Sequence, residues 1–133
     1  MADGPRIPFW IRIALISTGI LNIFGGVLFL PGAESLRTAN GFPAGSHPLY
    51  LSIISSWIFL FGICYLWLGF RGGNERLFLV IGAAGKSAFV GLAFLFAAFG
   101  DIPVTTALST IPDLVFAAIF VFYLVTSQKE PAG

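Results

Sequence analysis

Four long hydrophobic runs dominate the chain, over residues 8–30, 49–70, 77–99 and 104–125. Each run reaches the ~20 apolar residues that an α-helix needs to cross ~30 Å of hydrocarbon. None shows the alternation of a barrel strand, which crosses a membrane in about 9 to 11 residues. The pattern predicts an all-α fold: an integral membrane four-helix transmembrane bundle that forms a single domain over residues 1–133.

Proline and glycine residues mark the ends of these runs. Pro31 follows the first run, Pro48 immediately precedes the second, and Gly72 lies between the second and third runs. The last two connections are short, so we expect spans two, three and four to be sequential antiparallel neighbours. The long first loop, residues 31–47, contains a polar stretch at 34–40 that we expect to form a turn or two of surface helix.

Lysine and arginine residues are unevenly distributed between the two sides of the bundle. Arg37 alone lies on the side of the long loop, whereas the side of the two termini carries Arg6, Arg12, Arg71, Arg76 and Lys129. Basic residues accumulate in short cytoplasmic segments, which predicts that both termini are cytoplasmic. Arg12 lies about one turn inside its span, and we expect its side chain to extend to the cytoplasmic headgroups.

Composition excludes several classes of function. The chain is 57% hydrophobic and 10% charged with a net charge of +1, so it cannot form the basic surface that binds nucleic acid. Its one cysteine, Cys64, and one histidine, His47, cannot supply a disulfide or a closed zinc site, so no metal is expected. No catalytic motif is recognisable, and an enzymatic activity is not indicated.

Two opposite charges lie where lipid would be expected. Lys86 is nine residues into the third run and Asp113 nine residues into the fourth, so each lies roughly 14 Å deep, close to the bilayer midplane. A charge there costs at least ~2.5 to 3.5 kcal/mol unless it finds a partner or water. We expect the two side chains to pair. Two interpretations stay open: the pair fixes which helix faces meet, or it has a function.

Hydroxyl and amide side chains extend from this pair toward the side of the long loop. With Pro112, which leaves the carbonyl group of Leu108 without a donor, they predict an outward-facing polar pocket. The candidate binding residues are Lys86, Asp113, Asn22, Thr18, Ser109, Thr110, Ser55 and Ser56. The alternative is that each hydroxyl bonds its own helix backbone or holds two helices together.

Three sequence features point to a family. They are a glycine-bearing first span with Asn22, a central Lys86 preceded by Gly82-Ala-Ala-Gly, and Asp113 followed by an aromatic-rich helix. With four spans in so short a chain, the sequence resembles the broad DoxX-like family of small bacterial membrane proteins. The resemblance implies a multi-pass protein of the bacterial inner (cytoplasmic) membrane that serves as a quinone-linked subunit, a membrane partner of redox enzymes or an assembly chaperone. It assigns no catalytic residue.

Two classes of function remain open at the level of sequence. We favour an accessory or binding protein that holds a partner protein, a lipid or a quinone in its polar pocket, either beside another membrane protein or as a homo-oligomer. The alternative is a small proton- or ion-coupled transporter in which Asp113 titrates opposite Lys86. No inverted repeat relates the two halves of the sequence, which counts against a carrier.

Overall fold

The computed structural model describes residues 6–128, and every regular element in that range is helical. In order these are α1 (Phe9–Leu28), the 3-10 turn η1 (Pro31–Ala33), α2 (Glu34–Ala39), α3 (Pro48–Arg71), α4 (Arg76–Ala98), α5 (Val104–Leu108) and α6 (Ile111–Thr126). The helices α1, α3, α4 and the stretch Val104–Thr126 are long and apolar enough to cross a membrane. The predicted all-α, multi-pass membrane architecture is therefore confirmed, while Lys129 lies outside the described residues.

The helix ends follow the predicted punctuation. Pro48 occupies the first position of α3, where a backbone N–H would have no partner within the helix, so proline loses nothing by lacking one. The Leu49 N–H donates to His47 Nδ1 at 3.1 Å. The same helix ends at Gly72, whose φ of 72° lies in the left-handed region and whose N–H donates to the Leu68 carbonyl group at 2.8 Å. The polar stretch of the first loop forms α2, as expected.

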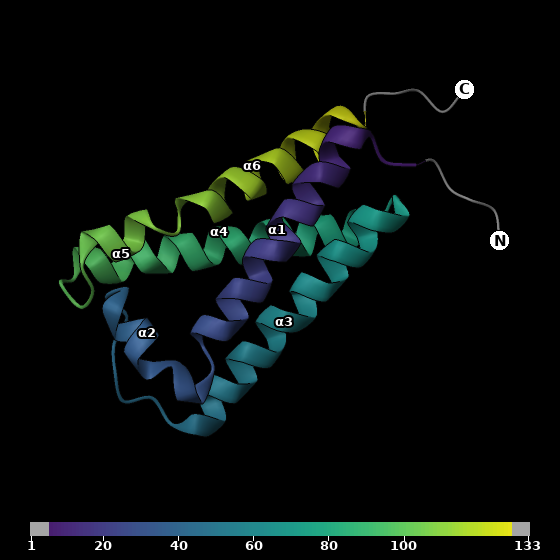
Figure 1. The fold of residues 1–133 in the computed structure, drawn as a ribbon. Coiled ribbons are helices and arrows are strands. Elements are labelled where there is room, and N and C mark those ends of the chain that lie inside the picture. Colours follow the sequence, from purple (N-terminus) through teal and green to yellow (C-terminus); the bar gives the residue numbers. More distant parts are fainter. Residues whose placement is uncertain (1–5, 129–133) are drawn as a thin grey trace.

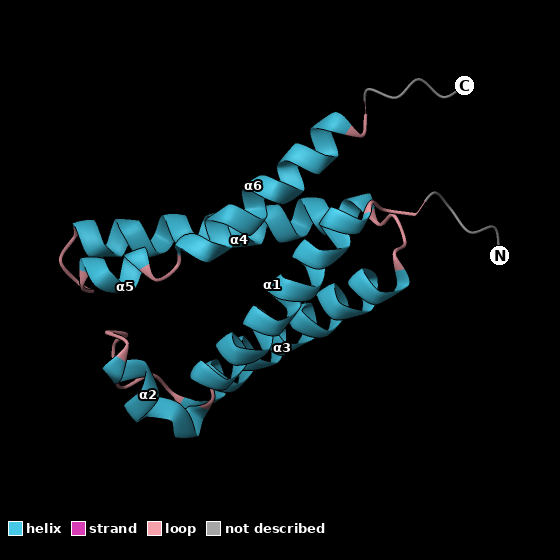
Figure 2. Ribbon diagram, turned by 45° about the horizontal axis from the view of Figure 1, so that its top comes forward, coloured by secondary structure: helices cyan, strands magenta, loops and turns pink. Residues whose placement is uncertain are grey.

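The helices form two hairpins (Figure 1). The first hairpin consists of α1 packed along α3, and the second consists of α4 packed along α5 and α6. The hairpins lie close together where α1 begins and α6 ends, which we call the terminal side, and they diverge toward the opposite end, the loop side (Figures 1 and 2). Backbone contact between the hairpins is chiefly that of α1 with α6.

The short connection between α3 and α4 does not make these helices neighbours along their lengths, so the predicted sequential packing of spans two and three is wrong. Their contact is made by aromatic side chains: the Phe78 ring lies 5.1 Å from that of Tyr65 between centroids. These bulky rings hold the two backbones apart. In contrast, a Cβ atom on Gly62 would lie only 3.2 Å from the Gly19 carbonyl oxygen, because glycine lets α3 approach α1 closely.

The densest packing lies on the terminal side, where both hairpins contribute. Tyr65 and Phe120 are almost fully buried, with ring centroids 5.8 Å apart. The surrounding buried cluster includes Ile7, Ile11, Leu15, Leu68, Leu79 and Tyr123. Large apolar side chains cover the outside of every span, as a lipid environment requires.

The first loop connects the two hairpins on the loop side. Arg37 is buried and donates to the carbonyl groups of Leu28 and Leu30, which fixes α2 against the end of α1. The Thr106 hydroxyl at the start of the fourth span donates to the Asn40 carbonyl group at 2.9 Å. The loop therefore bridges the diverging ends of the hairpins, and Figure 1 shows its helix α2 beside α5.

Candidate binding site

The predicted contact between Lys86 and Asp113 is present. Lys86 lies near the middle of α4 and Asp113 near the start of α6, and Lys86 Nζ is 2.5 Å from Asp113 Oδ1. The lysine side chain is only 6% exposed and the aspartate side chain 19%. A hydrogen-bonded pair of opposite charge is the arrangement in which two ions can remain this deep in a low-dielectric environment.

Asn22 extends this pair to the first hairpin. Lys86 Nζ donates to Asn22 Oδ1 at 3.2 Å, and Asn22 Nδ2 donates to the Ile58 carbonyl group of α3, also at 3.2 Å. The amide therefore has both its oxygen and its nitrogen bonded. Through it, the ammonium group of α4 is linked to α1 and α3 as well as to α6, so the site joins all four spans.

Aromatic faces surround the rest of the ammonium group. Lys86 Nζ lies 5.3 Å from the centroid of the Tyr65 ring and 5.9 Å from that of Phe116. Both distances are within the range in which the negative face of an aromatic ring attracts a cation. The cation is thus stabilised by a carboxylate, an amide oxygen and two rings.

The structure does not bring the other predicted residues into this cluster through hydrogen bonds. Ser55 donates to the Gly26 carbonyl group at 2.8 Å and so links α3 to α1. The other three hydroxyls bond their own chain segment: Ser56 to the Ser52 carbonyl group, Ser109 to that of Thr106 and Thr110 to that of Ala107. This is the alternative that the sequence left open for isolated hydroxyl side chains.

Thr18 is the exception among the predicted hydroxyls. Its side chain is fully buried, and Thr18 Oγ1 has no hydrogen-bond partner among the described residues. It lies one helical turn before Asn22 in α1. An unpaired buried hydroxyl costs about 1 to 3 kcal/mol, so it is a point of weakness in an otherwise bonded interior.

A polar pocket of about 380 Å³ opens on the loop side, between the first loop and α5. Of the predicted residues only Ser109 lines it; the other lining residues are Thr38, Ala39, Asn40, Gly41, Pro103, Thr105 and Thr106. Lys86 and Asp113 do not form its floor. The described part of the chain thus has a closed charged centre and a separate polar pocket nearer the surface.

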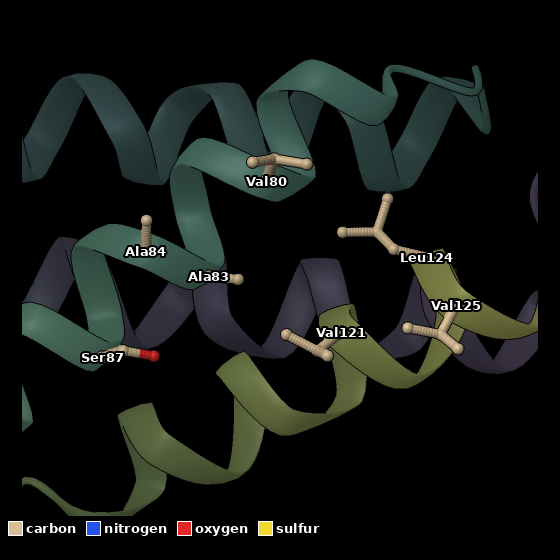
Figure 3. Close-up of a pocket in the computed structure, with 7 residues that line it drawn as sticks. All are labelled: Val80, Ala83, Ala84, Ser87, Val121, Leu124 and Val125. Carbon is tan, nitrogen blue, oxygen red and sulfur yellow. The ribbon is translucent and has the colours of Figure 1, made fainter.

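A second hollow, the α4/α6 groove, is apolar and has a volume of about 390 Å³. Figure 3 shows side chains of both helices around it: Val80, Ala83, Ala84 and Ser87 come from α4, and Val121, Leu124 and Val125 from α6. Sequence reasoning did not identify this groove, because its residues have the same character as the rest of the lipid-facing surface.

Sequence reasoning also missed two arginine contacts at the terminal side. Arg12 donates to the carbonyl groups of Gly69 and Phe70 at 2.9 and 2.8 Å rather than only extending to headgroups. Arg76 donates to the Leu124 carbonyl group at 2.7 Å. The last carbonyl groups of a helix lack intrahelical donors, so each arginine satisfies an otherwise open helix end. An arginine near the start of a span was the only signal in the sequence.

Comparison with family models, with curated proteins and with solved structures finds no match for this chain. The DoxX-like resemblance therefore stays a prediction from the sequence.

Proposed function

We propose that the chain is an accessory or binding protein of a bacterial cytoplasmic membrane, with both termini in the cytoplasm, and that it holds a hydrophobic ligand such as a lipid or a quinone. The asymmetry of basic residues supports the orientation, and labelling of a Ser46→Cys variant in a Cys64→Ser background tests it. If this cysteine reacts only from the cytoplasmic side, the orientation is the reverse of the one proposed. The DoxX-like resemblance is consistent with this class of function.

The observation that carries the proposal is the closed state of the charged centre. Lys86 and Asp113 neutralise each other, and the ammonium group is already surrounded by Asn22, Tyr65 and Phe116. The ammonium group, one oxygen of the Asp113 carboxylate and the Asn22 amide are thus engaged within the chain, so the buried cation needs no ligand to neutralise it. Binding is therefore expected on the surfaces of the bundle rather than at its midplane.

The α4/α6 groove supports a hydrophobic ligand. Its lining is almost entirely apolar, and Ala83, Ala84 and Ser87 leave room where larger side chains would fill the space between the helices. Its volume lies within the ~300 to 1,000 Å³ typical of small-molecule sites. An acyl or isoprenoid chain fits such a lining.

Filling the groove tests the proposal. Ala84 lines it and is exposed, whereas Ala88, one turn further along α4, is exposed but does not line it. We expect Ala84→Phe to abolish lipid or quinone retained through gentle extraction, measured by native mass spectrometry. Ala88→Phe, the matched control, should retain the ligand of the wild-type protein. Equal retention by both variants, or none by the wild type, would contradict binding in the groove.

The alternative, a proton- or ion-coupled carrier, is favoured by one feature. Thr106, Ser109 and Thr110 extend along the fourth span from the loop-side pocket toward Asp113. If these hydroxyl side chains form part of a path for protons or ions, purified protein in liposomes should support flux under a pH gradient and a membrane potential. Asp113→Asn should abolish that flux. We expect no flux above that of empty liposomes, and robust Asp113-dependent flux would replace the binding proposal.

A further inference from the structure

The two hairpins share one pattern of buried positions. Residues of α4 lie 64 positions after their counterparts in α1, as Lys86 does after Asn22. In this register the buried pairs are Leu15 with Leu79, Thr18 with Gly82, Gly19 with Ala83 and Gly26 with Val90. Residues of α5 and α6 lie 55 positions after their counterparts in α3, as Thr106 does after Leu51. In this second register the other buried pairs are Ser55 with Thr110, Gly62 with Ala117, Tyr65 with Phe120 and Leu68 with Tyr123.

The arginine contacts follow the same two registers. Arg12 of α1 donates to the Gly69 carbonyl group of α3, and Arg76 of α4 donates to the Leu124 carbonyl group of α6. The two donors are counterparts, and so are the two acceptors. A common helical period can align buried faces by itself, but it does not align a donor and its acceptor on two different helices.

The midplane contacts give a third correspondence. Asn22 donates to the carbonyl group of Ile58, and Lys86 donates to the side chain of Asp113. Again the donors are counterparts in α1 and α4, and the acceptor residues are counterparts in α3 and α6. The second hairpin therefore has an ion pair where the first has an amide bonded to a backbone carbonyl group.

Counterparts also meet each other where the hairpins touch. Lys86 contacts Asn22, and the Tyr65 ring contacts that of Phe120. A residue contacts its own counterpart only beside a two-fold axis. Both hairpins begin on the terminal side and return to it, so this axis runs along the membrane normal, and the repeat is parallel rather than inverted (Figure 1).

We infer that the chain is a tandem duplication of one helical hairpin, and that the inner face of each hairpin is an interface fitted to a second copy of the same hairpin. The bundle is a covalently joined pseudo-dimer. Asn22 and Lys86 are the two versions of one interface position, and their hydrogen bond joins the copies. The contact between Asn22 and Ile58 is the uncharged counterpart of the Lys86–Asp113 pair.

Relocating the ion pair into the first hairpin tests this correspondence in the full chain. The relocated variant combines Asn22→Lys, Ile58→Asp, Lys86→Asn and Asp113→Ile. Its control omits only Ile58→Asp and so leaves the lysine introduced by Asn22→Lys without a carboxylate. A broken buried pair lowers stability far more than a relocated one, so thermal unfolding in detergent should place the control ~5 °C or more below the relocated variant. A relocated variant no more stable than its control would overturn the duplication.

A test without charges uses the packing beside the axis. A Cβ atom on Gly82 would lie 2.5 Å from the Tyr65 hydroxyl oxygen, so glycine makes room for tyrosine there. The two-fold relation predicts that Thr18, the counterpart of Gly82, occupies the space where a hydroxyl on Phe120 would lie. Phe120→Tyr should lower the unfolding temperature by several degrees, and adding Thr18→Gly should restore it. The exposed control Phe122→Tyr should have no effect. Loss without rescue, or no loss at all, would contradict the inferred axis.

Discussion

The two hairpins have the same architecture but are held together by different interactions. In the first hairpin, Gly19 and Gly62 bring the backbones of α1 and α3 into close contact, and Ser55 and Asn22 donate across the interface to carbonyl groups. In the second hairpin, an ion pair joins α4 to a span that is interrupted between α5 and α6.

The difference shows two solutions to the same problem. Lipid is as apolar as leucine, so burial of apolar surface cannot drive helices together within a bilayer. Close van der Waals contact between small residues is one way to hold a helix pair, and a strong polar contact is another. The first hairpin relies on glycine, and the second relies on charge.

Removing one charge should give the largest effect. We expect Lys86→Met and Asp113→Leu each to lower stability by about 3 to 5 kcal/mol, because each leaves the other charge buried and unpaired. The double variant should be close to wild type, since two apolar side chains can replace a buried pair at little cost. Thermal unfolding of the four proteins in one detergent measures this cycle. Losses that simply add would show that the two side chains act independently.

A methyl group in the glycine interface should give an intermediate effect. A Cβ atom on Gly62 would lie 3.0 Å from the Asn22 Cβ atom and 3.2 Å from the Gly19 carbonyl oxygen. We expect Gly62→Ala to cost about 1 to 3 kcal/mol through overpacking. Gly85→Ala in the second hairpin, where nothing lies within 4 Å, is the control and should be neutral or slightly stabilising. Equal effects at the two positions would mean that close packing of α1 against α3 does not set the cost at Gly62.

The smallest losses of stability should come from the serine side chains of the first hairpin. Ser55→Ala removes a hydrogen bond between helices, which is worth about 0.6 kcal/mol in a membrane protein, whereas Ser56→Ala removes only an intrahelical bond and should be silent. Thr18→Val replaces an unpaired hydroxyl by a methyl group of similar size and should raise the unfolding temperature. A loss of stability for Thr18→Val would mean that this hydroxyl has a bonded partner in solution.

The sequence was sufficient for the spans and for the contact of Lys86 with Asp113. Membrane thickness fixes the length of a span, and an isolated charge in lipid is costly enough to require a partner, so both follow from strong constraints. The side-by-side pairing of α1 with α3 was not predictable in the same way. It depends on which glycine positions face one another, and one hydrophobic sequence offers several such faces.

The predicted pocket illustrates a different limit. Ser109 and Asp113 follow helical spacing along one span, yet only Ser109 reaches the loop-side pocket, and Asp113 is engaged by Lys86. Spacing on one helix tells which residues share a face. It does not tell whether a hydroxyl group donates to a neighbouring helix or to its own backbone, because a serine or threonine can do either.

The interruption of the fourth span changes the electrostatic setting of Asp113. Because α6 starts afresh at Ile111, this carboxylate, although deep in the apolar layer, lies in the first turn of a helix. The aligned peptide dipoles of α6 present their positive end there, which typically stabilises an anion by about 0.3 to 1 kcal/mol, and by up to about 2 when partly buried. A continuous helix through this point would offer no such field. The break thus supplies Asp113 with a second source of positive potential besides Lys86, directed along the axis of its own helix.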